Sequence, residues 1–173
     1  MKIALIGTHS TGKTTLAYAV ASELRKAGAN AIVLTEIARN CPFPINEQRT
    51  LEGQLWILYT QLKEELEKER TCDVLISDRS VIDPWIYTIT KFNRSRVEYL
   101  EPLVLKQART YYLLFKTPIK PEYLKYDGFR STSTEFQKLI DDEMTKFLKD
   151  NKIPHIVLPA EGTMQAILNY AKR

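Results

Sequence analysis

The chain has 173 residues, 44% of them hydrophobic and 27% charged, which predicts one soluble globular domain (residues 1–173) large enough to bury its own core. No apolar run approaches the length of a membrane span and the first strand lacks the flanks of a signal peptide, so we expect a cytoplasmic protein without a membrane partner. The net charge of +4 suits anionic ligands, but no basic stripe interleaved with aromatic residues supports a nucleic-acid surface.

The cysteines and histidines do not form a metal or redox motif. Cys41 and Cys72 lie far apart in the sequence and fit neither a CxxC pair nor a zinc cluster, so two reduced thiols are expected. His9 and His155 likewise form no metal-ligand pair.

A glycine-rich loop joins the first predicted strand, residues 2–6, to the first predicted helix. It fits the pattern G-x-x-x-x-G-K-[ST] at every fixed position and is followed by one more threonine. Its residues are Gly7, Thr8, His9, Ser10, Thr11, Gly12, Lys13, Thr14 and Thr15. A plain glycine turn would leave the Lys-Thr pair unexplained, so we interpret the segment as a P-loop that binds a nucleoside triphosphate.

Each residue type in this loop suits a polyphosphate. Gly7 and Gly12 allow backbone conformations and a close approach that a β-carbon would obstruct, so that successive N–H groups can surround phosphates at a helix N-terminus. Lys13 adds a positive charge at the β- and γ-phosphates. The hydroxyl of Thr14 is placed to ligate Mg²⁺, with Thr15 as a substitute.

Charged residues follow the second predicted strand, residues 31–34. Ligands of open parallel sheets collect beyond the carboxyl ends of the strands, so Glu36 and Arg39 are candidates for the substrate site. The alternative is a solvated charge pair in a loop.

A long amphipathic helix is predicted next, with Asn46 as its N-cap and its end near Arg70. Its apolar positions step by three or four residues: Leu51, Leu55, Leu58, Leu62 and Leu66. The charged run from Glu64 to Glu69 is expected to face solvent.

The third predicted strand, residues 73–78, is closed by a carboxylate. An acidic residue at this place is the expected partner of a P-loop, so Asp78 would hold the Mg²⁺ shell directly or through water. Arg79 follows at once. It either stabilises transferred charge, holds an acceptor, or forms a structural ion pair with Asp78.

A helix is predicted to begin after Asp83, with Asp83 as its N-cap and Pro84 at its first position. Two further strands are predicted at residues 111–115 and 155–158. The alternation of strands and helices predicts a doubly wound α/β sheet. The segment from Pro159 to Gly162, beyond the last strand, is a place for contacts with a nucleotide base.

The segment 116–133 follows neither the helical nor the strand period and contains prolines, a glycine and several cations. Long loops of this kind are often lids, and a lid can exclude water from phosphoryl transfer and deliver a cation to it. Arg130 is the candidate for that cation. The alternative is an ordinary surface arginine.

These residues together resemble the nucleoside and nucleotide kinases of the P-loop class. The likeness is to the family that includes nicotinamide-riboside kinase domains, and more distantly to thymidylate kinases and deoxynucleoside kinases. It rests on four segments: Gly7 to Thr15, Thr35 to Arg39, Asp78 to Ser80, and Asp127 to Arg130. It implies a five-stranded parallel sheet in the order 2-3-1-4-5, with ATP and Mg²⁺ as cofactors. The Asp78 segment looks like the Asp-Arg motif of thymidylate kinases and the Glu-Arg-Ser motif of deoxynucleoside kinases, and matches neither wholly.

The leading interpretation is an ATP-dependent kinase that transfers the γ-phosphate to a small nucleoside- or nucleotide-like acceptor. The catalytic candidates are Lys13, Glu36, Asp78, Arg79 and Arg130, and the metal candidates are Thr14 and Asp78. A hydroxyl acceptor would use Glu36 as a base, whereas a phosphate acceptor would use the cations of Arg39, Arg79 and Arg130. We favour the hydroxyl.

Two other functions share the P-loop. One is an NTPase, such as an ATPase, that acts as a nucleotide-dependent regulator with a protein or nucleic-acid partner; the sequence lacks the Asn-Lys-x-Asp segment of guanine-selective switches. The other is a polynucleotide 5′-kinase, whose binding of oligonucleotides would depend steeply on salt.

Overall fold

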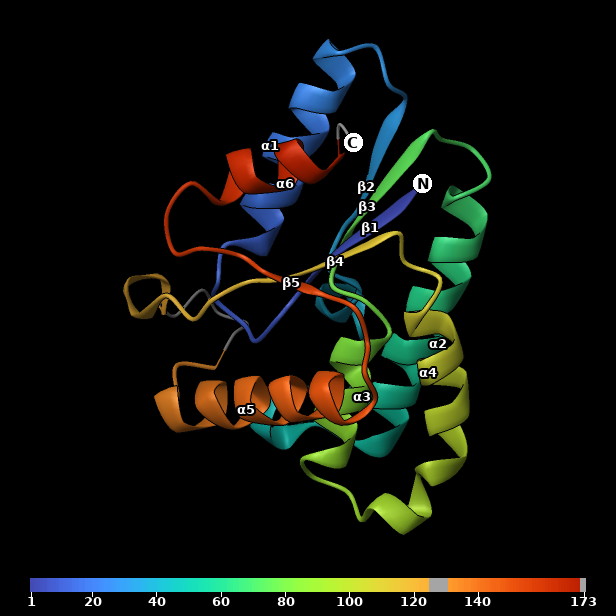
Figure 1. The fold of residues 1–173 in the computed structure, drawn as a ribbon. Coiled ribbons are helices and arrows are strands. Elements are labelled where there is room, and N and C mark those ends of the chain that lie inside the picture. The colour runs from blue at the N-terminus through green and yellow to red at the C-terminus, as the bar shows by residue number, and fades with distance from the viewer. Residues whose placement is uncertain (125–130, 172–173) are drawn as a thin grey trace.

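The computed structural model describes residues 1–124 and 131–171. Its centre is a five-stranded parallel sheet in the order β2-β3-β1-β4-β5, which confirms the expected α/β class and strand order (Figure 1). The strands are β1 (Lys2–Ile6), β2 (Ala31–Leu34), β3 (Val74–Asp78), β4 (Leu113–Lys116) and β5 (Ile156–Val157). β1 lies in the middle, with Ile3 opposite Ile76 of β3 on one side and opposite Leu113 of β4 on the other.

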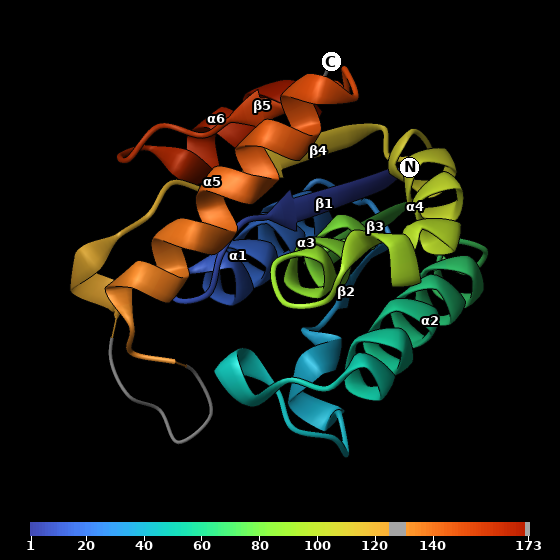
Figure 2. The same cartoon turned by 90° about the horizontal axis from the view of Figure 1, so that it is seen from below.

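Helices cover both faces of the sheet. They are α1 (Lys13–Lys26), α2 (Leu51–Lys68), α3 (Ile82–Ile89), α4 (Glu101–Ala108), α5 (Thr134–Asp150) and α6 (Thr163–Ala171). Short 3-10 turns connect them: η1 (Ile37–Asn40), η2 (Asn46–Gln48), η3 (Arg94–Arg96), η4 (Glu98–Leu100) and η5 (Pro121–Tyr123). α1 and α6 lie on one face, and the other face carries α2, α3, α4 and α5 (Figures 1 and 2). Of the helices in the described ranges, none is long and apolar enough to span a membrane.

The alternation of side chains along β1 builds a core on each face of the sheet. Ile3 and Leu5 pack with apolar residues of α1 and α6, whereas Ala4 and Ile6 pack with those of α3, α4 and α5. All of β1 is buried. The loop that follows this strand therefore starts from a fully buried strand in the middle of the sheet.

The start of α2 differs from the prediction. Thr50 is the N-cap, because its hydroxyl accepts a 3.1 Å hydrogen bond from Gly53 N, and Asn46 instead begins the turn η2. Asp83 is also not the residue before its helix: α3 begins one residue earlier, at Ile82, and Asp83 lies inside the first turn.

The prediction that the charged run of α2 faces solvent is wrong for Glu65. Its side chain is 0% exposed and forms an ion pair with the buried Lys2, at 3.2 Å. It also accepts hydrogen bonds from Tyr111 Oη, at 2.6 Å, and from Gln61 Nε2, at 2.7 Å. A carboxylate can be buried at this place because a cation and two donors compensate its lost hydration.

Candidate active site

The P-loop needs glycine where the backbone turns. Gly7 has a φ of 139° and Gly12 a φ of 80°, both in the region that favours glycine. A β-carbon on Gly7 would lie 2.6 Å from Thr117 Oγ1, so the close approach of the segment after β4 requires glycine here as well. Ser10, with a φ of 55°, adopts a left-handed conformation that non-glycine residues rarely occupy.

Lys13 is buried at the start of α1 and turns its ammonium back into the loop. Nζ donates to the carbonyl oxygen of Thr8 and, at 3.0 Å, to Thr11 Oγ1. Burial, with the nearby charge of Arg79, lowers the pKa of Lys13 to about 8. Among the described residues no carboxylate pairs directly with this ammonium, and a buried cation of this kind suits an anionic ligand.

Thr14 and Asp78 come together at the ends of two different elements. Thr14 Oγ1, in the first turn of α1, donates a 2.5 Å hydrogen bond to Asp78 Oδ2 at the end of β3. Burial raises the pKa of Asp78. A hydroxyl and a carboxylate are the oxygen donors that Mg²⁺ accepts, with phosphates and water completing its shell. Within the described ranges no three His, Cys, Asp or Glu side chains cluster to hold a metal.

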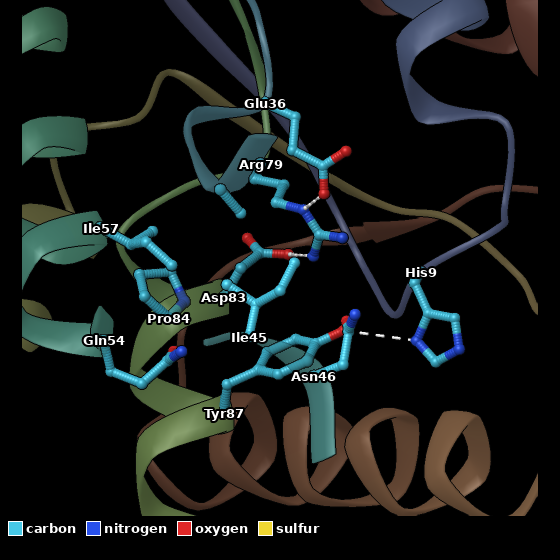
Figure 3. A pocket seen from close by; sticks show the side chains of 11 residues that line it. His9, Glu36, Ile45, Asn46, Gln54, Ile57, Arg79, Asp83, Pro84 and Tyr87 are labelled. Carbon is cyan, nitrogen blue, oxygen red and sulfur yellow. Dashed lines mark hydrogen bonds and ion pairs between the residues drawn. The ribbon is translucent and has the colours of Figure 1, made fainter. Parts of the chain in front are cut away.

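A small pocket, which we call the inner pocket, lies beside the P-loop and has a volume of about 40 Å³. It is lined by His9, Glu36, Ala38, Ile45, Asn46, Gln54, Ile57, Arg79, Asp83, Pro84 and Tyr87. Figure 3 shows Glu36, Arg79 and Asp83 converging in this pocket, while the Tyr87 hydroxyl points at His9, whose Nδ1 is 3.4 Å away. The candidates Glu36 and Arg79 are thus brought together next to the P-loop.

Arg79 is held by several groups at once. Nε donates to Glu36 Oε1 at 2.6 Å, and Nη1 lies 3.5 Å from both Asp83 Oδ1 and the carbonyl oxygen of Gly7. Burial alone would lower the pKa of Arg79, but Glu36, together with Tyr87 and Asp83, raises it well above its usual value. Arg79 therefore remains a cation, and it pairs with Glu36 and Asp83 rather than with Asp78.

The backbone of Arg79 is itself unusual, with a φ of 86°. Its N–H still donates to Leu5 O, at 3.0 Å, so the strand-like pairing continues to this residue before the chain turns. A left-handed conformation in a long side-chain residue costs free energy, and such conformations concentrate at functional sites.

The remaining candidates are Arg39 and Arg130. Arg39 Nε is 3.3 Å from Glu36 Oε2, but the Arg39 side chain is 42% exposed and does not line the inner pocket. Arg130, the candidate lid cation, lies outside the described residues, as does part of the predicted lid 116–133.

A second, larger pocket of about 490 Å³, the outer pocket, is lined by the P-loop and the first turns of α1. Its lining residues are Ser10, Thr11, Gly12, Thr15, Leu16, Ala19, Thr117, Pro118, Lys120, Glu122, Tyr123 and Thr163. Thr163 directly follows the segment from Pro159 to Gly162, where base contacts were predicted. The ring of Tyr123 packs against the loop, 3.0 Å from the position of a β-carbon on Gly12.

Sequence reasoning missed several residues of the inner pocket, among them Gln54, Asp83 and Tyr87. Asp83 was interpreted only as a helix cap, and Tyr87 sits in an apolar stretch without a motif. Gln54 carried a usable signal, because Gln61 follows it by seven residues and Glu65 follows Gln61 by four, which places all three on one face of a helix. All three are buried, on the same helix as the buried Ile57 and Leu58.

Residues 2–166 match the AAA domain family, which covers most of the chain. The chain belongs to this family. The P-loop of the AAA domain implies nucleotide binding. No curated protein sequence matches the chain.

Solved structures similar to this AAA domain are of kinases and of NadR. Deoxyadenosine kinase from M. mycoides with bound dATP is 18% identical, with a TM-score of 0.76 over 100% of both chains. NadR protein in complex with NR is 22% identical, with a TM-score of 0.79 over 99% of this chain and 52% of that chain, so this AAA domain spans about half of NadR. Thymidylate kinase from Ehrlichia chaffeensis is 17% identical, with a TM-score of 0.69 over 99% and 98% of the two chains. The resemblance in fold to nucleoside and nucleotide kinases is confirmed.

Proposed function

We propose that the protein is an ATP-dependent kinase that transfers the γ-phosphate, with Mg²⁺, to a hydroxyl of a small nucleoside-like acceptor. The observation that carries the proposal is the buried pair of Glu36 and Arg79, 2.6 Å apart, in an apolar pocket that shares His9 with the P-loop. Hydrolysis alone would not need the apolar walls and the buried Gln54 amide of this pocket, whereas a small acceptor would use both.

The inner pocket suits a flat ring with polar edges. Ile45, Ile57, Pro84 and Tyr87 supply apolar walls. Gln54 is buried at 3% exposure, and in the described part of the chain nothing hydrogen-bonds to its side-chain amide. A buried amide with one acceptor and two donors available matches the edge of a nucleobase or a pyridine amide.

Glu36 is the group that would act on the acceptor. As the acceptor oxygen bonds to the γ-phosphorus, the bond from that phosphorus to the β–γ bridging oxygen breaks and ADP leaves; the hydroxyl proton passes to the Glu36 carboxylate. The guanidinium of Arg79, whose Nε lies 2.6 Å from Glu36 Oε1, would hold the carboxylate in its orientation. On the donor side, loop N–H groups and Lys13 would hold the phosphates, and Thr14 and Asp78 would hold Mg²⁺, which neutralises the charge between β- and γ-phosphates. Arg130 is our candidate for a further cation supplied by the lid.

The pocket must widen to admit such an acceptor. Its volume of about 40 Å³ has room for little more than a water molecule or two. Ala38 on η1, with Ile45 and Asn46 at the start of η2, forms one wall, and Ser131 donates a hydrogen bond to Glu47 of the same turn. We infer that these turns and the lid end attached to them move outward when acceptor binds.

The experiment is a screen of ribonucleosides, deoxynucleosides, pyridine ribosides and their monophosphates with ATP and Mg²⁺. ADP formation is measured against the rate with water alone, and a nucleoside-type acceptor is expected to raise it. If no acceptor does so, the kinase proposal must be given up; hydrolysis that rises only with a protein or nucleic-acid partner would point to the regulatory NTPase instead. The structures of deoxyadenosine kinase with dATP and of NadR with NR support the choice of compounds.

A further inference from the structure

Asp83 makes contacts that a helix cap does not require. Its side chain lies in the first turn of α3, and the residue is 1% exposed. One carboxylate oxygen, Oδ2, accepts hydrogen bonds from Ser80 N, at 2.8 Å, and from Ser80 Oγ, at 3.1 Å. These two bonds fasten the turn between β3 and α3. The other oxygen, Oδ1, takes no part in this cap.

Oδ1 joins the P-loop to the inner pocket. It accepts from the backbone N–H of Gly7, at 3.3 Å, and it lies 3.5 Å from Arg79 Nη1. Arg79 Nη1 is also 3.5 Å from the carbonyl oxygen of Gly7, which closes a ring of contacts among the three residues. The opposite side of the same guanidinium holds Glu36 through Nε.

The support for this carboxylate is rigid. Its neighbours on α3, Ile82, Trp85 and Ile86, are fully buried in the core, so the helix cannot shift without disturbing close packing. Both carboxylate oxygens are engaged, so the group cannot rotate without losing hydrogen bonds. A neutral amide could cap Ser80 equally well, but it would then turn an NH₂ group toward two other donors, Gly7 N and Arg79 Nη1.

We propose that Asp83 is a positioning residue that ties the orientation of Arg79, and through it Glu36, to the backbone of the P-loop. The proposal rests on the proposed function. Gly7 opens the loop that would surround the phosphates, so an adjustment of its backbone on nucleotide binding passes through Oδ1 to Arg79. Nucleotide and acceptor then bind cooperatively, each raising affinity for the other about five-fold or more.

The test follows Arg79 directly by NMR. In ¹⁵N-labelled protein, the Arg79 Nε–H and Gly7 amide resonances are recorded before and after addition of Mg²⁺ and the non-hydrolysable nucleotide AMP-PNP. Both are expected to shift in the wild type. In Asp83→Asn, calorimetry should still detect nucleotide binding and the Gly7 amide should still respond, but the response of Arg79 should be lost.

Glu65→Gln is the matched control. It neutralises another fully buried carboxylate, which contacts Lys2 and Tyr111 away from the inner pocket, so it tests whether mere destabilisation produces the effect. This variant should keep the Arg79 response. Should Asp83→Asn fail to fold, Asp83→Ser replaces it, because a serine hydroxyl can still cap the turn but is too short to reach Gly7 and Arg79.

The outcomes separate the coupling from the function. The proposed coupling through Asp83 is overturned if the wild type binds nucleotide without any response of Arg79, or if the response is unchanged in Asp83→Asn. Either result leaves the proposed function standing. If calorimetry shows that the wild-type protein binds no nucleotide, both the proposed function and the proposed coupling fail. With an acceptor from the screen, Asp83→Asn should raise the acceptor KM about five-fold with a smaller change in kcat.

Discussion

The hydroxyl of Thr14 and the carboxylate of Asp78 meet at 2.5 Å, although 64 positions separate them in the sequence. One residue opens the first helix and the other ends a strand next to the central one, so the fold itself creates this pair of oxygen donors. Their contact is the starting point for predicting how the protein uses Mg²⁺.

Asp78→Asn should raise the Mg²⁺ concentration needed for half-maximal turnover roughly ten-fold, because the amide removes a negative charge from the metal's surroundings. The measurement is ADP formation as a function of Mg²⁺ at fixed ATP. Thr14→Ser is the control, since it retains the hydroxyl and should stay near the wild type. Identical Mg²⁺ curves for Asp78→Asn and wild type would remove Asp78 from the metal site.

Lys13→Met should abolish measurable nucleotide binding and at the same time stabilise the fold. The buried ammonium has a pKa lowered to about 8, so folding disfavours its charged form, and an apolar side chain of similar length avoids that penalty. The free energy of unfolding at pH 7 should rise by about 1–3 kcal/mol in denaturant titrations. Lys26→Met, an exposed position on the same helix, should change neither quantity.

The pH dependence of nucleotide binding should report the same lysine. Its charged form predominates below pH 8 in the ligand-free protein and is lost as pH rises further. Affinity for AMP-PNP should therefore stay level up to about pH 8 and fall by up to about ten-fold per pH unit above it.

The contribution of Lys13 to the free energy of unfolding should change with pH in the opposite direction to the nucleotide affinity. The folded pKa of about 8 is below the ordinary value of 10.5, so between these values the unfolded chain holds more protons and stability rises with pH. Calorimetry and denaturant titrations from pH 6.5 upward test both trends, at roughly half-unit steps. Lys13→Met should show neither, and a wild-type affinity that is flat to pH 10 would contradict the assignment.

Glu36→Gln should lower kcat by about 10² to 10⁴ while leaving AMP-PNP affinity unchanged, because it removes the proton acceptor but nothing that faces the phosphates. Arg39→Gln serves as the control: it removes the partly exposed partner of Glu36 and should have little effect on turnover. Thermal unfolding checks that Arg79 is still accommodated. A Glu36→Gln enzyme of near wild-type kcat would favour a phosphate acceptor or hydrolysis.

Gln54→Leu should raise the acceptor KM about 10- to 100-fold, because a hydrogen bond to the acceptor is lost and a polar edge is left unpaired. Nucleotide affinity should not change, and stability should be retained, since Gln54 donates no side-chain hydrogen bond within the described ranges. Gln61→Leu, two turns along the same helix face, is the matched control. Its amide bonds Glu65 and Ser77, so this variant should lose stability but not acceptor affinity.

The sequence was most informative where function depends on local pattern. The P-loop and Asp78 lie in a strand-loop-helix or strand-end context that a few adjacent residues define. The structure brings Thr14 and Asp78 into contact, and their roles toward nucleotide and Mg²⁺ stay predictions. The α/β class and the order of strands also followed, from periodicity and from the resemblance.

Features that depend on partners distant in sequence could not be derived. The charge of Glu65 looked like a solvated one because its compensating groups, Lys2 and Tyr111, lie on other elements. Likewise, the second role of Asp83 depends on Gly7, 76 positions away, and a capping pattern already explained its presence. The partners of Arg79 could not be chosen from the sequence either. Asp78 and Asp83 are close to it in the chain, and Glu36 follows a neighbouring strand, so each was a possible ion-pair partner.

The central place of β1 in the sheet has a consequence for how the chain assembles. Of the five strands of this sheet, β1 is made first, and neither of its partners exists until residues 74–78 and then residues 113–116 emerge from the ribosome. Its Lys2 must also wait for Glu65 to neutralise it. Nascent chains should therefore gain protease resistance late and abruptly, once β4 has cleared the exit tunnel, because the sheet closes around its oldest strand.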